Sequence, residues 1–374
     1  MKYFLISGEA SGDLHGANLI RELKKIDNQA DFCFFGGDNM SREAAVKPLR
    51  HIKDMAFMGV WDVIKNYKKI KDNLILCKKQ LLEYKPDVVI LIDYPGFNLK
   101  IAEFAHNQGF KVFYYISPKI WAWNKKRAYK IKRFVDKMFV IFPFEIDFYK
   151  RYNYQVEYLG NPTVDEVYEF LQKSYDKEKF YRENGLDKNL PVIALLPGSR
   201  RQELKYLLPV MNKIASKLPD YQFVIAGMSI LSPSYYKSLR NLKIVWDNSY
   251  LLLRFSYAAL VTSGTATLET ALFKVPQVVM YKTAWLQYLI GSIIVRIKFF
   301  SLVNIIAGKE VVKELLQYNL VERGYKELKK ILYDKHYYES IKDNYKIIID
   351  KLGPSGCAER TAKRIYTLLK KNEN

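Results

Sequence analysis

An aspartate that directly follows a wholly apolar stretch is the strongest candidate for chemistry in this sequence. Residues 88–92 are all valine, leucine or isoleucine, Asp93 comes next, and Pro95-Gly96 turns the chain at once. An unbroken apolar stretch is typical of a parallel strand buried on both faces, which places Asp93 at its carboxyl end. Partial burial there raises the pKa of a carboxyl group and suits a base that accepts a proton from an attacking hydroxyl. We also assign Asn98, five residues later, to the substrate site. The alternative is that Asp93 or Asn98 only caps the next helix.

A turn rich in glycine and acidic residues follows the first apolar stretch. It reads Ser7-Gly8-Glu9-Ala10-Ser11-Gly12-Asp13-Leu14-His15-Gly16. The glycines permit close approach of a ligand or of another element, but their spacing matches neither the dinucleotide fingerprint nor the P-loop. The turn therefore predicts a substrate contact, which we assign to Gly8, Glu9, Ser11, Gly12 and Asp13. The alternative is an ordinary strand-to-helix turn capped by Ser11 or Asp13.

Two tryptophans follow another apolar stretch, in the segment Ser117-Pro118-Lys119-Ile120-Trp121-Ala122-Trp123. At the mouth of a sheet, Trp121 and Trp123 predict a platform for a sugar ring or an acyl chain, with Ser117 beside it. The next residues, 125–137, contain seven lysines and arginines against one aspartate. That combination favours an anionic membrane surface or phosphate groups, and it would also suit RNA. The alternative is one core tryptophan beside a solvated helix face.

The turn at Gly198, Ser199 and Arg200 predicts a diphosphate site at the start of a helix. Backbone amides without helical partners and a guanidinium both bind phosphate oxygens. Ser199 and Gln202 also have the spacing of a capping box, which is the structural alternative.

A second helix start, at Ser263, Gly264 and Thr265, predicts a nucleotide contact. Small hydroxyl residues and backbone amides can hold phosphate there. One turn later, Glu269 can accept hydrogen bonds from both hydroxyls of a ribose. An ordinary capped helix is again the alternative.

The composition narrows the class of protein. The 374 residues carry a formal charge of +21, which implies a polyanionic partner or merely a lysine-rich solvated surface. Three distant cysteines and four scattered histidines give no metal-ligand spacing, so we expect no disulfide framework, no metal and no cofactor. The longest apolar stretch, 284–295, is too short to span a bilayer.

Short apolar stretches alternate with helical patterns along the whole chain, which predicts an α/β protein with doubly wound parallel sheets. The expected strands are 3–7, 32–35, 88–92, 112–116 and 138–141 in the first half, and 192–196, 222–226, 243–245, 258–262 and 277–280 in the second. We expect an N-terminal domain at 1–160, a second domain at 161–345 and a C-terminal helix in 346–374 that returns to the first domain. Two such domains create a cleft between the carboxyl ends of their strands.

Six motifs occur in a fixed order over nearly the whole chain. They are Ser-Gly-Glu-x-Ser-Gly-Asp at 7–13, Ile-Asp-x-Pro-x-Phe-Asn at 92–98, Ser-Pro-x-x-Trp-Ala-Trp at 117–123, Pro-Gly-Ser-Arg at 197–200, Ser-Gly-Thr-Ala-x-Leu-Glu at 263–269 and Asn-Ile-Ile-Ala-Gly-Lys-Glu-Val-Val-Lys-Glu-Leu-Leu-Gln at 304–317. Together they resemble the lipid-A-disaccharide synthase family. The resemblance implies a GT-B fold, in which two Rossmann-like domains face a cleft, the first binding the acceptor and the second UDP.

The resemblance also implies a reaction. UDP-2,3-diacylglucosamine and 2,3-diacylglucosamine 1-phosphate would give a β-1,6-linked disaccharide and UDP, with inversion and with Asp93 as the base. Arg200 would bind the diphosphate and Glu269 the ribose, while Asn304 and Gln317 would line the donor pocket. Both substrates are acylated and anionic, so the resemblance implies a cytoplasmic enzyme that docks on the inner face of the inner membrane. Residues 57–71, apolar and then lysine-rich, fit an interfacial helix.

Two other functions remain open from the sequence. An enzyme acting on a soluble UDP-sugar would not need the tryptophan surfaces. A basic nucleic-acid-binding protein would show salt-dependent binding to oligonucleotides, but it would leave Asp93 and the helix start at Thr265 and Glu269 unexplained. We therefore expect UDP-sugar, acylated acceptor and membrane lipid as partners, and no nucleic acid.

Overall fold

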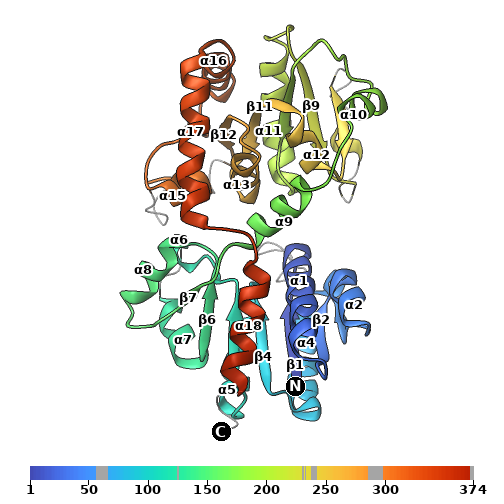
Figure 1. The fold of residues 1–374 in the computed structure, drawn as a ribbon, viewed down its shortest axis with the longest axis vertical. Helices are drawn as coiled ribbons and strands as arrows, with labels where there is room; N and C mark the ends of the chain where they lie inside the picture. The colour runs from blue at the N-terminus through green and yellow to red at the C-terminus, as the bar shows by residue number, and fades with distance from the viewer. Residues whose placement is uncertain are drawn as a thin grey trace. The chain divides into compact units, whose positions relative to one another are not determined.

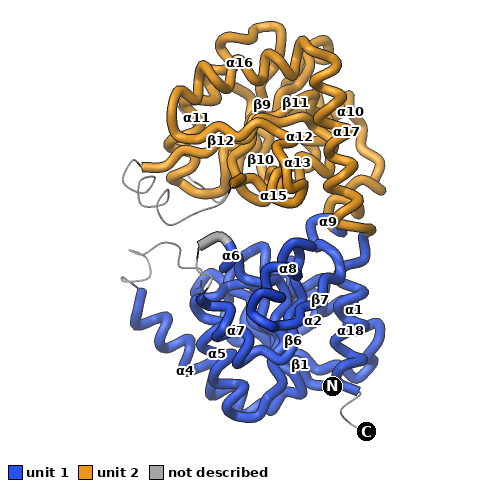
Figure 2. Tube along the Cα trace, turned by 90° about the vertical axis from the view of Figure 1, so that its left-hand side faces the viewer, with its two compact units in different colours: residues 1–165, 355–374 blue, residues 166–354 orange. Residues whose placement is uncertain are grey.

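The chain forms two compact α/β units in a computed structural model that describes residues 1–55, 66–123, 126–229, 231, 233–236, 242–284 and 298–370. Unit 1 comprises Met1–Asp165 and Ser355–Asn374, and unit 2 comprises Glu166–Pro354 (Figure 2). The chain passes from unit 1 to unit 2 after Asp165 and returns to unit 1 after Pro354, in both cases later than the expected positions 160 and 346. The return is later because the helix before it, α17 (Lys335–Leu352), continues without a break to its last residue.

The sheet of unit 1 has seven parallel strands in the order β3-β2-β1-β4-β5-β6-β7. The strands are β1 (Lys2–Ser7), β2 (Asp31–Gly36), β3 (Arg50–His51), β4 (Val88–Ile92), β5 (Val112–Tyr115), β6 (Lys137–Val140) and β7 (Glu157–Tyr158). Every residue of β4 is fully buried, and each such aliphatic side chain contributes about 1.5–3 kcal/mol to folding. The strand order reverses between β1 and β4, which is the switch point of a doubly wound sheet.

Helices cover both faces of this sheet (Figure 1). One face packs against α1 (Ala10–Ile26), α2 (Asp38–Ala44) and α18 (Cys357–Lys370). The other packs against α4 (Tyr67–Tyr84), α5 (Pro95–Asn107), α7 (Arg127–Phe134) and α8 (Phe144–Lys150), with the short α6 (Ile120–Trp123) before α7. A short 3-10 helix, Ile52–Asp54, follows β3.

Unit 2 repeats the plan with six parallel strands in the order β10-β9-β8-β11-β12-β13. They are β8 (Val192–Leu196), β9 (Gln222–Gly227), β10 (Lys243–Trp246), β11 (Ser256–Thr262), β12 (Gln277–Tyr281) and β13 (Glu314–Leu316). The helices are α9 (Pro162–Leu171), α10 (Lys177–Glu183), α11 (Arg201–Ala215), α12 (Ser249–Arg254), α13 (Thr265–Leu272), α15 (Leu302–Ala307), α16 (Leu320–Tyr333) and α17 (Lys335–Leu352), with a 3-10 turn at Pro233–Tyr235. Here the order reverses between β8 and β11.

The structure confirms the α/β class and all ten expected strands to within two residues at either end. A short apolar stretch that is buried on both faces forms few structures other than a parallel strand, which explains why the expected and observed strands agree. The sequence did not reveal β3, β7 or β13, because edge strands of two or three residues carry no periodicity.

The last helix, α18, belongs to unit 1, although the chain reaches it from α17 of unit 2 (Figure 2). The Asp165 carboxylate accepts hydrogen bonds from the backbone amides of Gly356 (2.7 Å), Cys357 (3.0 Å) and Ala358 (3.1 Å). A carboxylate at a helix start satisfies amides that have no helical partner. Arg364 and Glu157 form a bidentate ion pair further along the helix, at 2.6 and 2.8 Å.

No described helix is long and apolar enough to cross a membrane. The apolar residues 57, 58, 60 and 61 of the expected interfacial helix lie outside the described residues, as does most of the stretch 284–295. The lysines at 68, 69 and 71 lie on α4, where all three are exposed.

Replacement of Asp165 by alanine should loosen α18 from unit 1. The loss of one carboxylate cap costs about 1–2 kcal/mol, and three amides lose their acceptor at once. We expect the urea midpoint of the full chain to fall accordingly, measured by circular dichroism. Asp72→Ala, which removes an exposed aspartate from α4, is the control and should leave the midpoint unchanged. Equal midpoints for the two variants would contradict the capping role.

Candidate functional site

Four of the six sequence motifs lie at the switch points of the two sheets. In unit 1, the turn at Gly8 and Glu9 follows β1, and Asp93 follows the neighbouring β4. In unit 2, the turn at residues 197–200 follows β8, and the turn at 263–265 follows the neighbouring β11. Ligands of open α/β sheets bind beyond the carboxyl ends of the strands at such points. Each unit therefore brings two of its motifs together at one edge of its sheet.

The backbone of Asp93 is held in an unusual conformation. Asp93 and Tyr94 have φ angles of 41° and 48°, in the left-handed region that residues other than glycine rarely adopt. The Asp93 carbonyl accepts hydrogen bonds from Asn98 Nδ2 at 2.8 Å and from the Tyr114 hydroxyl at 2.5 Å. Strained residues persist only where the surroundings over-determine them. We conclude that Asn98 and Tyr114 fix the turn that carries the Asp93 carboxylate.

The Asp93 carboxyl is partly buried, and its pKa is raised to about 6. Burial is the main cause, and the nearby Glu9 carboxylate adds to it. Lys119, the Tyr94 amide and His15 act in the opposite direction. A carboxyl group with this pKa is ionised at neutral pH and still basic enough to accept a proton during a reaction.

The alternative role of Asp93 and Asn98 as helix caps is wrong. Tyr94 is the N-cap residue of α5, and no side chain caps that helix. The fully buried Asn98 instead directs its amide nitrogen back to the carbonyls of Ile92 (3.2 Å) and Asp93. Asn98 therefore supports the candidate base and has no surface on which to contact a substrate directly.

The turn after β1 has structural as well as ligand-facing residues. The buried Asp13 accepts hydrogen bonds from the backbone amides of Gly37 (2.6 Å), Asn39 (3.0 Å) and Met40 (3.2 Å), and so holds the start of α2. A side chain at Gly8 would overlap the Tyr94 ring. The first helix begins at Ala10 with Glu9 as its N-cap residue, so neither Ser11 nor Asp13 caps it. Glu9 and Ser11 are two accessible polar side chains of this turn.

The segment after β5 also turns in a strained conformation, since Ile116 has a φ angle of 68°. Ser117 is buried and hydrogen-bonds to the Tyr149 hydroxyl at 2.8 Å. The Trp121 ring packs edge-on against Phe144, with 5.0 Å between centroids, as expected of a core tryptophan. Trp123 ends α6, and its side chain lies outside the described residues. The direct substrate contacts predicted for Ser117 and Trp121 are therefore not supported by their positions.

Glu145 is a buried acid that the sequence did not reveal. It lies on α8 and accepts hydrogen bonds from the backbone amides of Ile141 (3.2 Å) and Phe142 (3.0 Å). Burial raises its pKa to about 7, although the Phe142 amide, Ser117 and Lys119 stabilise its charged form. No motif marks it, because an acid near a helix start usually serves only the helix dipole.

In unit 2, the turn after β8 is closed by an acid. Glu203 Oε2 accepts hydrogen bonds from the backbone amides of Ser199 (3.0 Å) and Arg200 (3.2 Å). The expected capping box of Ser199 and Gln202 is thus wrong by one residue, because Arg200 is the N-cap residue. Gly198 has a φ of 107°, and a side chain there would collide with Glu203. The Arg200 side chain is 68% exposed, so its guanidinium is accessible to a diphosphate.

The turn after β11 opens α13 at Thr265. Ser263 donates a hydrogen bond to the Phe300 carbonyl at 2.8 Å, which fixes the end of the strand. Glu269 lies one turn into α13 and is partly buried. The Tyr250 hydroxyl donates a hydrogen bond to its Oε1 atom at 3.2 Å. Thr265 is exposed and Gly264 partly exposed, so this helix start is accessible to a ligand.

Asn304 and Gln317 are held by their own unit. The fully buried Asn304 donates to the Val312 carbonyl (2.9 Å) and to Glu314 (2.8 Å), and its oxygen accepts from Val311 (2.7 Å) and Val312 (3.1 Å). These bonds use its whole hydrogen-bonding capacity. The Gln317 side chain donates a hydrogen bond to the Thr283 carbonyl at 3.0 Å and accepts one from the Thr283 backbone amide at 3.2 Å. Their assignment to UDP stays a prediction, and the structure gives both residues an internal role.

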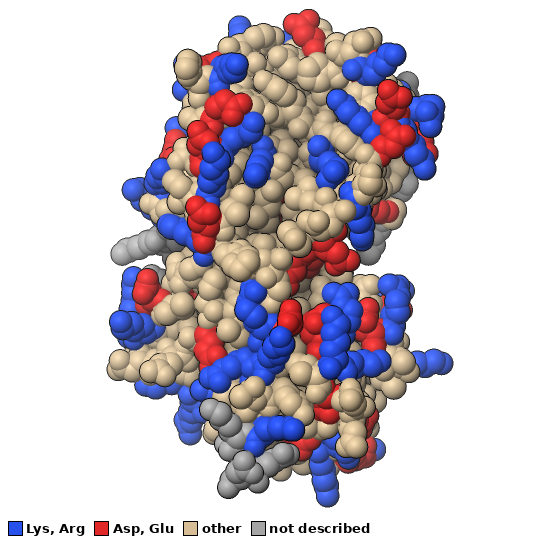
Figure 3. Space-filling model, viewed as in Figure 1, with Lys and Arg blue, Asp and Glu red and all other residues tan. Residues whose placement is uncertain are grey.

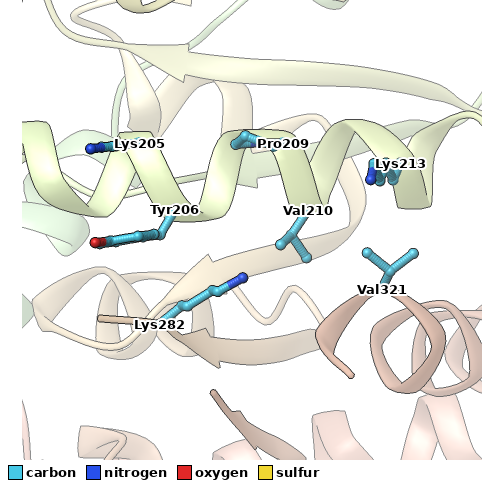
Figure 4. A pocket seen from close by; sticks show the side chains of 7 residues that line it. All are labelled: Lys205, Tyr206, Pro209, Val210, Lys213, Lys282 and Val321. Atoms are coloured by element: carbon cyan, nitrogen blue, oxygen red, sulfur yellow. The ribbon is translucent and has the colours of Figure 1, made fainter. Parts of the chain in front are cut away.

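A groove of about 240 Å³ lies on unit 2 between α11, the end of β12 and the start of α16. Figure 4 shows Tyr206 and Val210 pointing from α11 toward Lys282. The groove is lined by Lys205, Tyr206, Pro209, Val210, Lys213, Lys282 and Val321. None of the residues predicted to bind UDP lines it.

Comparison with known proteins decides the family. A family model described as lipid-A-disaccharide synthetase matches residues 3–364. The chain belongs to the lipid-A-disaccharide synthase family. It is 37% identical to the lipid-A-disaccharide synthase of Geobacter sulfurreducens, over 99% of this chain and 98% of the relative. It is 38% identical to that of Syntrophus aciditrophicus, with the same coverage.

Solved structures show the fold. A putative UDP-N-acetylglucosamine 2-epimerase from Listeria monocytogenes has a TM-score of 0.68 and 16% identity, over 99% of this chain and 97% of that one. The UDP-GlcNAc 2-epimerase from Neisseria meningitidis has a TM-score of 0.63 and the same identity, over 99% of this chain and 100% of that one. These likenesses confirm the GT-B fold of the lipid-A-disaccharide synthase family member described here.

The pH dependence of turnover should report the charge around Asp93. As the predicted base, Asp93 would have to be ionised to accept a proton, so kcat/KM should fall as the pH drops through about 6. Lys119→Met removes a charge that lowers the pKa of Asp93 and should move this limb to higher pH. Glu9→Gln removes a charge that raises it and should move the limb to lower pH. Shifts in the same direction for both variants would contradict this electrostatic arrangement.

Proposed function

We propose that this chain is an inverting, UDP-dependent hexosyltransferase that forms the lipid A disaccharide, with Asp93 as its base. The single observation that carries the proposal is the family match over residues 3–364. The fixed Asp93 turn at the switch point of unit 1 supports the assignment of the base. The donor is UDP-2,3-diacylglucosamine, and the acceptor is 2,3-diacylglucosamine 1-phosphate.

The chemistry is a single displacement. Asp93 takes the proton from the 6-hydroxyl of the acceptor, and that oxygen attacks the anomeric carbon of the donor. The bond from this carbon to the diphosphate breaks, and UDP leaves with the bonding electrons. Attack from the face opposite the leaving group inverts the anomeric centre and gives the β-1,6 linkage. Positioned proton transfer of this kind contributes about 10²–10⁴-fold to a rate.

The donor is assigned to unit 2. The Arg200 guanidinium neutralises the leaving diphosphate, the role that a metal ion has in other transferases. Amides at the start of α13, with Ser263, Gly264 and Thr265, are the second phosphate contact. Glu269 accepts hydrogen bonds from the ribose hydroxyls. Its position one turn into α13 supports this, because a carboxylate there lies near the phosphate-binding helix start.

The acceptor is assigned to unit 1. Glu9 and Ser11 are accessible polar side chains of the turn after β1, and the charges of Glu9 and the exposed Lys119 act on Asp93. Asp13, Asn98 and Ser117 act indirectly, because they hold the turns that carry these groups. No acceptor atom needs to reach a buried residue in this arrangement.

We place the enzyme at the inner face of the inner membrane, docked on anionic lipid. The face of unit 1 that carries α4 and α7 supports this, because exposed Tyr67 (66%), Ile75 (56%) and Tyr129 (64%) stand among exposed lysines. On the face formed by α1 and α18, acidic and basic side chains are interspersed (Figure 3). Ion pairs such as Lys363 with Glu359 neutralise charge there.

Asp93→Ala should abolish turnover and leave the donor site intact. With acylated donor and acceptor in detergent micelles, we expect UDP release to fall by about 10²–10⁴-fold. The affinity for UDP, measured by calorimetry, should stay within a few-fold of wild type. Asp72→Ala, in an exposed position on α4, is the control and should retain wild-type turnover.

Two results would contradict the proposal. Wild-type turnover in Asp93→Ala would remove that residue from its role as the base. Release of UDP from UDP-N-acetylglucosamine, with none from the acylated donor and acceptor, would reject lipid A disaccharide synthesis in favour of an enzyme for a soluble UDP-sugar.

A further inference from the structure

Tyr250, on α12, lies between two glutamates. Its hydroxyl oxygen is 3.2 Å from Glu269 Oε1 and 3.5 Å from Glu166 Oε2. A phenol carries one proton, so the two carboxylates share a single donor. All three residues belong to unit 2. No motif marked Tyr250, which is one of 29 tyrosines in the chain.

Aromatic packing fixes the Tyr250 ring. Phe170 packs edge-on against it, with 5.5 Å between centroids, and Phe273 packs at a tilt, at 5.3 Å. These two rings also contact each other, and Phe170 stacks on Tyr175 at 4.4 Å. A ring held on two sides has a hydroxyl in a fixed place. A glutamate side chain has three rotatable bonds and needs a partner to hold one orientation.

The Tyr250 hydroxyl stays protonated. Burial raises its pKa well above the ordinary value for tyrosine, and the charges of Glu269 and Glu166 raise it further. Tyr250 is therefore a hydrogen-bond donor to the carboxylates at every pH at which the enzyme works. Without that donor, Glu269 and Glu166 would both lose the hydrogen bond that Tyr250 offers them.

We propose that Tyr250 is a positioning residue that orients the Glu269 carboxylate toward the ribose hydroxyls of the nucleotide. This inference rests on the proposed function, in which Glu269 binds the ribose. A carboxylate has about four acceptor positions, so Glu269 can accept from Tyr250 and from two ribose hydroxyls at once. Tyr250 acts through Glu269 and makes no contact with the nucleotide itself.

The preference for UDP over 2′,3′-dideoxy-UDP tests the inference, because only UDP has the ribose hydroxyls. Calorimetry on the full chain should show that wild type binds UDP more tightly. In Tyr250→Phe this preference should fall about 10-fold, which is about 1.4 kcal/mol, while the affinity for dideoxy-UDP stays within about two-fold. Tyr257→Phe is the matched control, since its partly exposed ring stacks on Tyr338. It should keep the wild-type preference.

A second variant removes the competing charge. Glu166→Gln keeps the shape of the side chain but replaces the carboxylate by a neutral amide, whose oxygen is a weaker acceptor, so Tyr250 should donate mainly to Glu269. The preference for UDP should then equal or exceed that of wild type. A 10-fold loss of preference in Glu166→Gln would contradict the inference, because it would show that Tyr250 alone does not hold Glu269.

The remaining outcomes separate this inference from the proposed function. Glu269→Ala should lose the preference entirely, and an unchanged preference would reject the ribose role of Glu269. A lost preference in Glu269→Ala together with a wild-type preference in Tyr250→Phe would overturn only the role of Tyr250. An equal loss of affinity for UDP and for dideoxy-UDP in Tyr250→Phe would also overturn the role of Tyr250, because such a loss would indicate a general structural effect.

Discussion

The Asp93 carbonyl, rather than its carboxylate, has the hydrogen bonds on which the proposed chemistry depends. Two successive left-handed residues end β4, and the Asn98 amide and the Tyr114 hydroxyl both donate to the carbonyl between them. Asn98 comes from the next helix and Tyr114 from the next strand. The turn is thus tied to two neighbouring elements of the sheet, and the carboxylate is placed before any substrate arrives. Pre-organisation of this kind removes ordering costs from the reaction.

In the proposed function, the charged groups of unit 2 hold UDP, which leaves after the reaction. Glu203 satisfies the two amides of the turn after β8, and the largely exposed Arg200 guanidinium lies 3.9 Å from the Glu203 carboxylate. On this proposal the diphosphate meets an exposed cation beside a closed turn. Glu269 differs, because it accepts a hydrogen bond from Tyr250, whose ring is held by aromatic neighbours. On the same proposal, a ribose contact fixed by packing and an exposed phosphate contact suit binding followed by release of UDP.

The sequence predicted the strands and the turns but not which polar residues face a ligand. An apolar stretch of this kind has one structural interpretation, a buried strand, so the sequence placed Asp93, Gly8, Ser199 and Thr265 at the correct strand ends. An Asp, Asn or Ser in a turn has two possible roles, because it can contact a ligand or form an internal hydrogen bond. The residue type alone does not distinguish these roles. Asp13 and Asn304 use their oxygens on backbone amides. Tyr114 and Tyr250 were not singled out, because their roles depend on contacts between elements distant in the chain.

The central claim is that Asp93 is the group whose ionisation permits turnover. A direct test is the titration of its ¹³Cγ resonance, assigned by comparison with Asp93→Asn and followed alongside kcat/KM over the same pH range. We expect Asp93 to titrate near pH 6, together with the acidic limb of kcat/KM. A titration near the ordinary value for aspartate, with the kinetic limb unmoved at a higher pH, would contradict it.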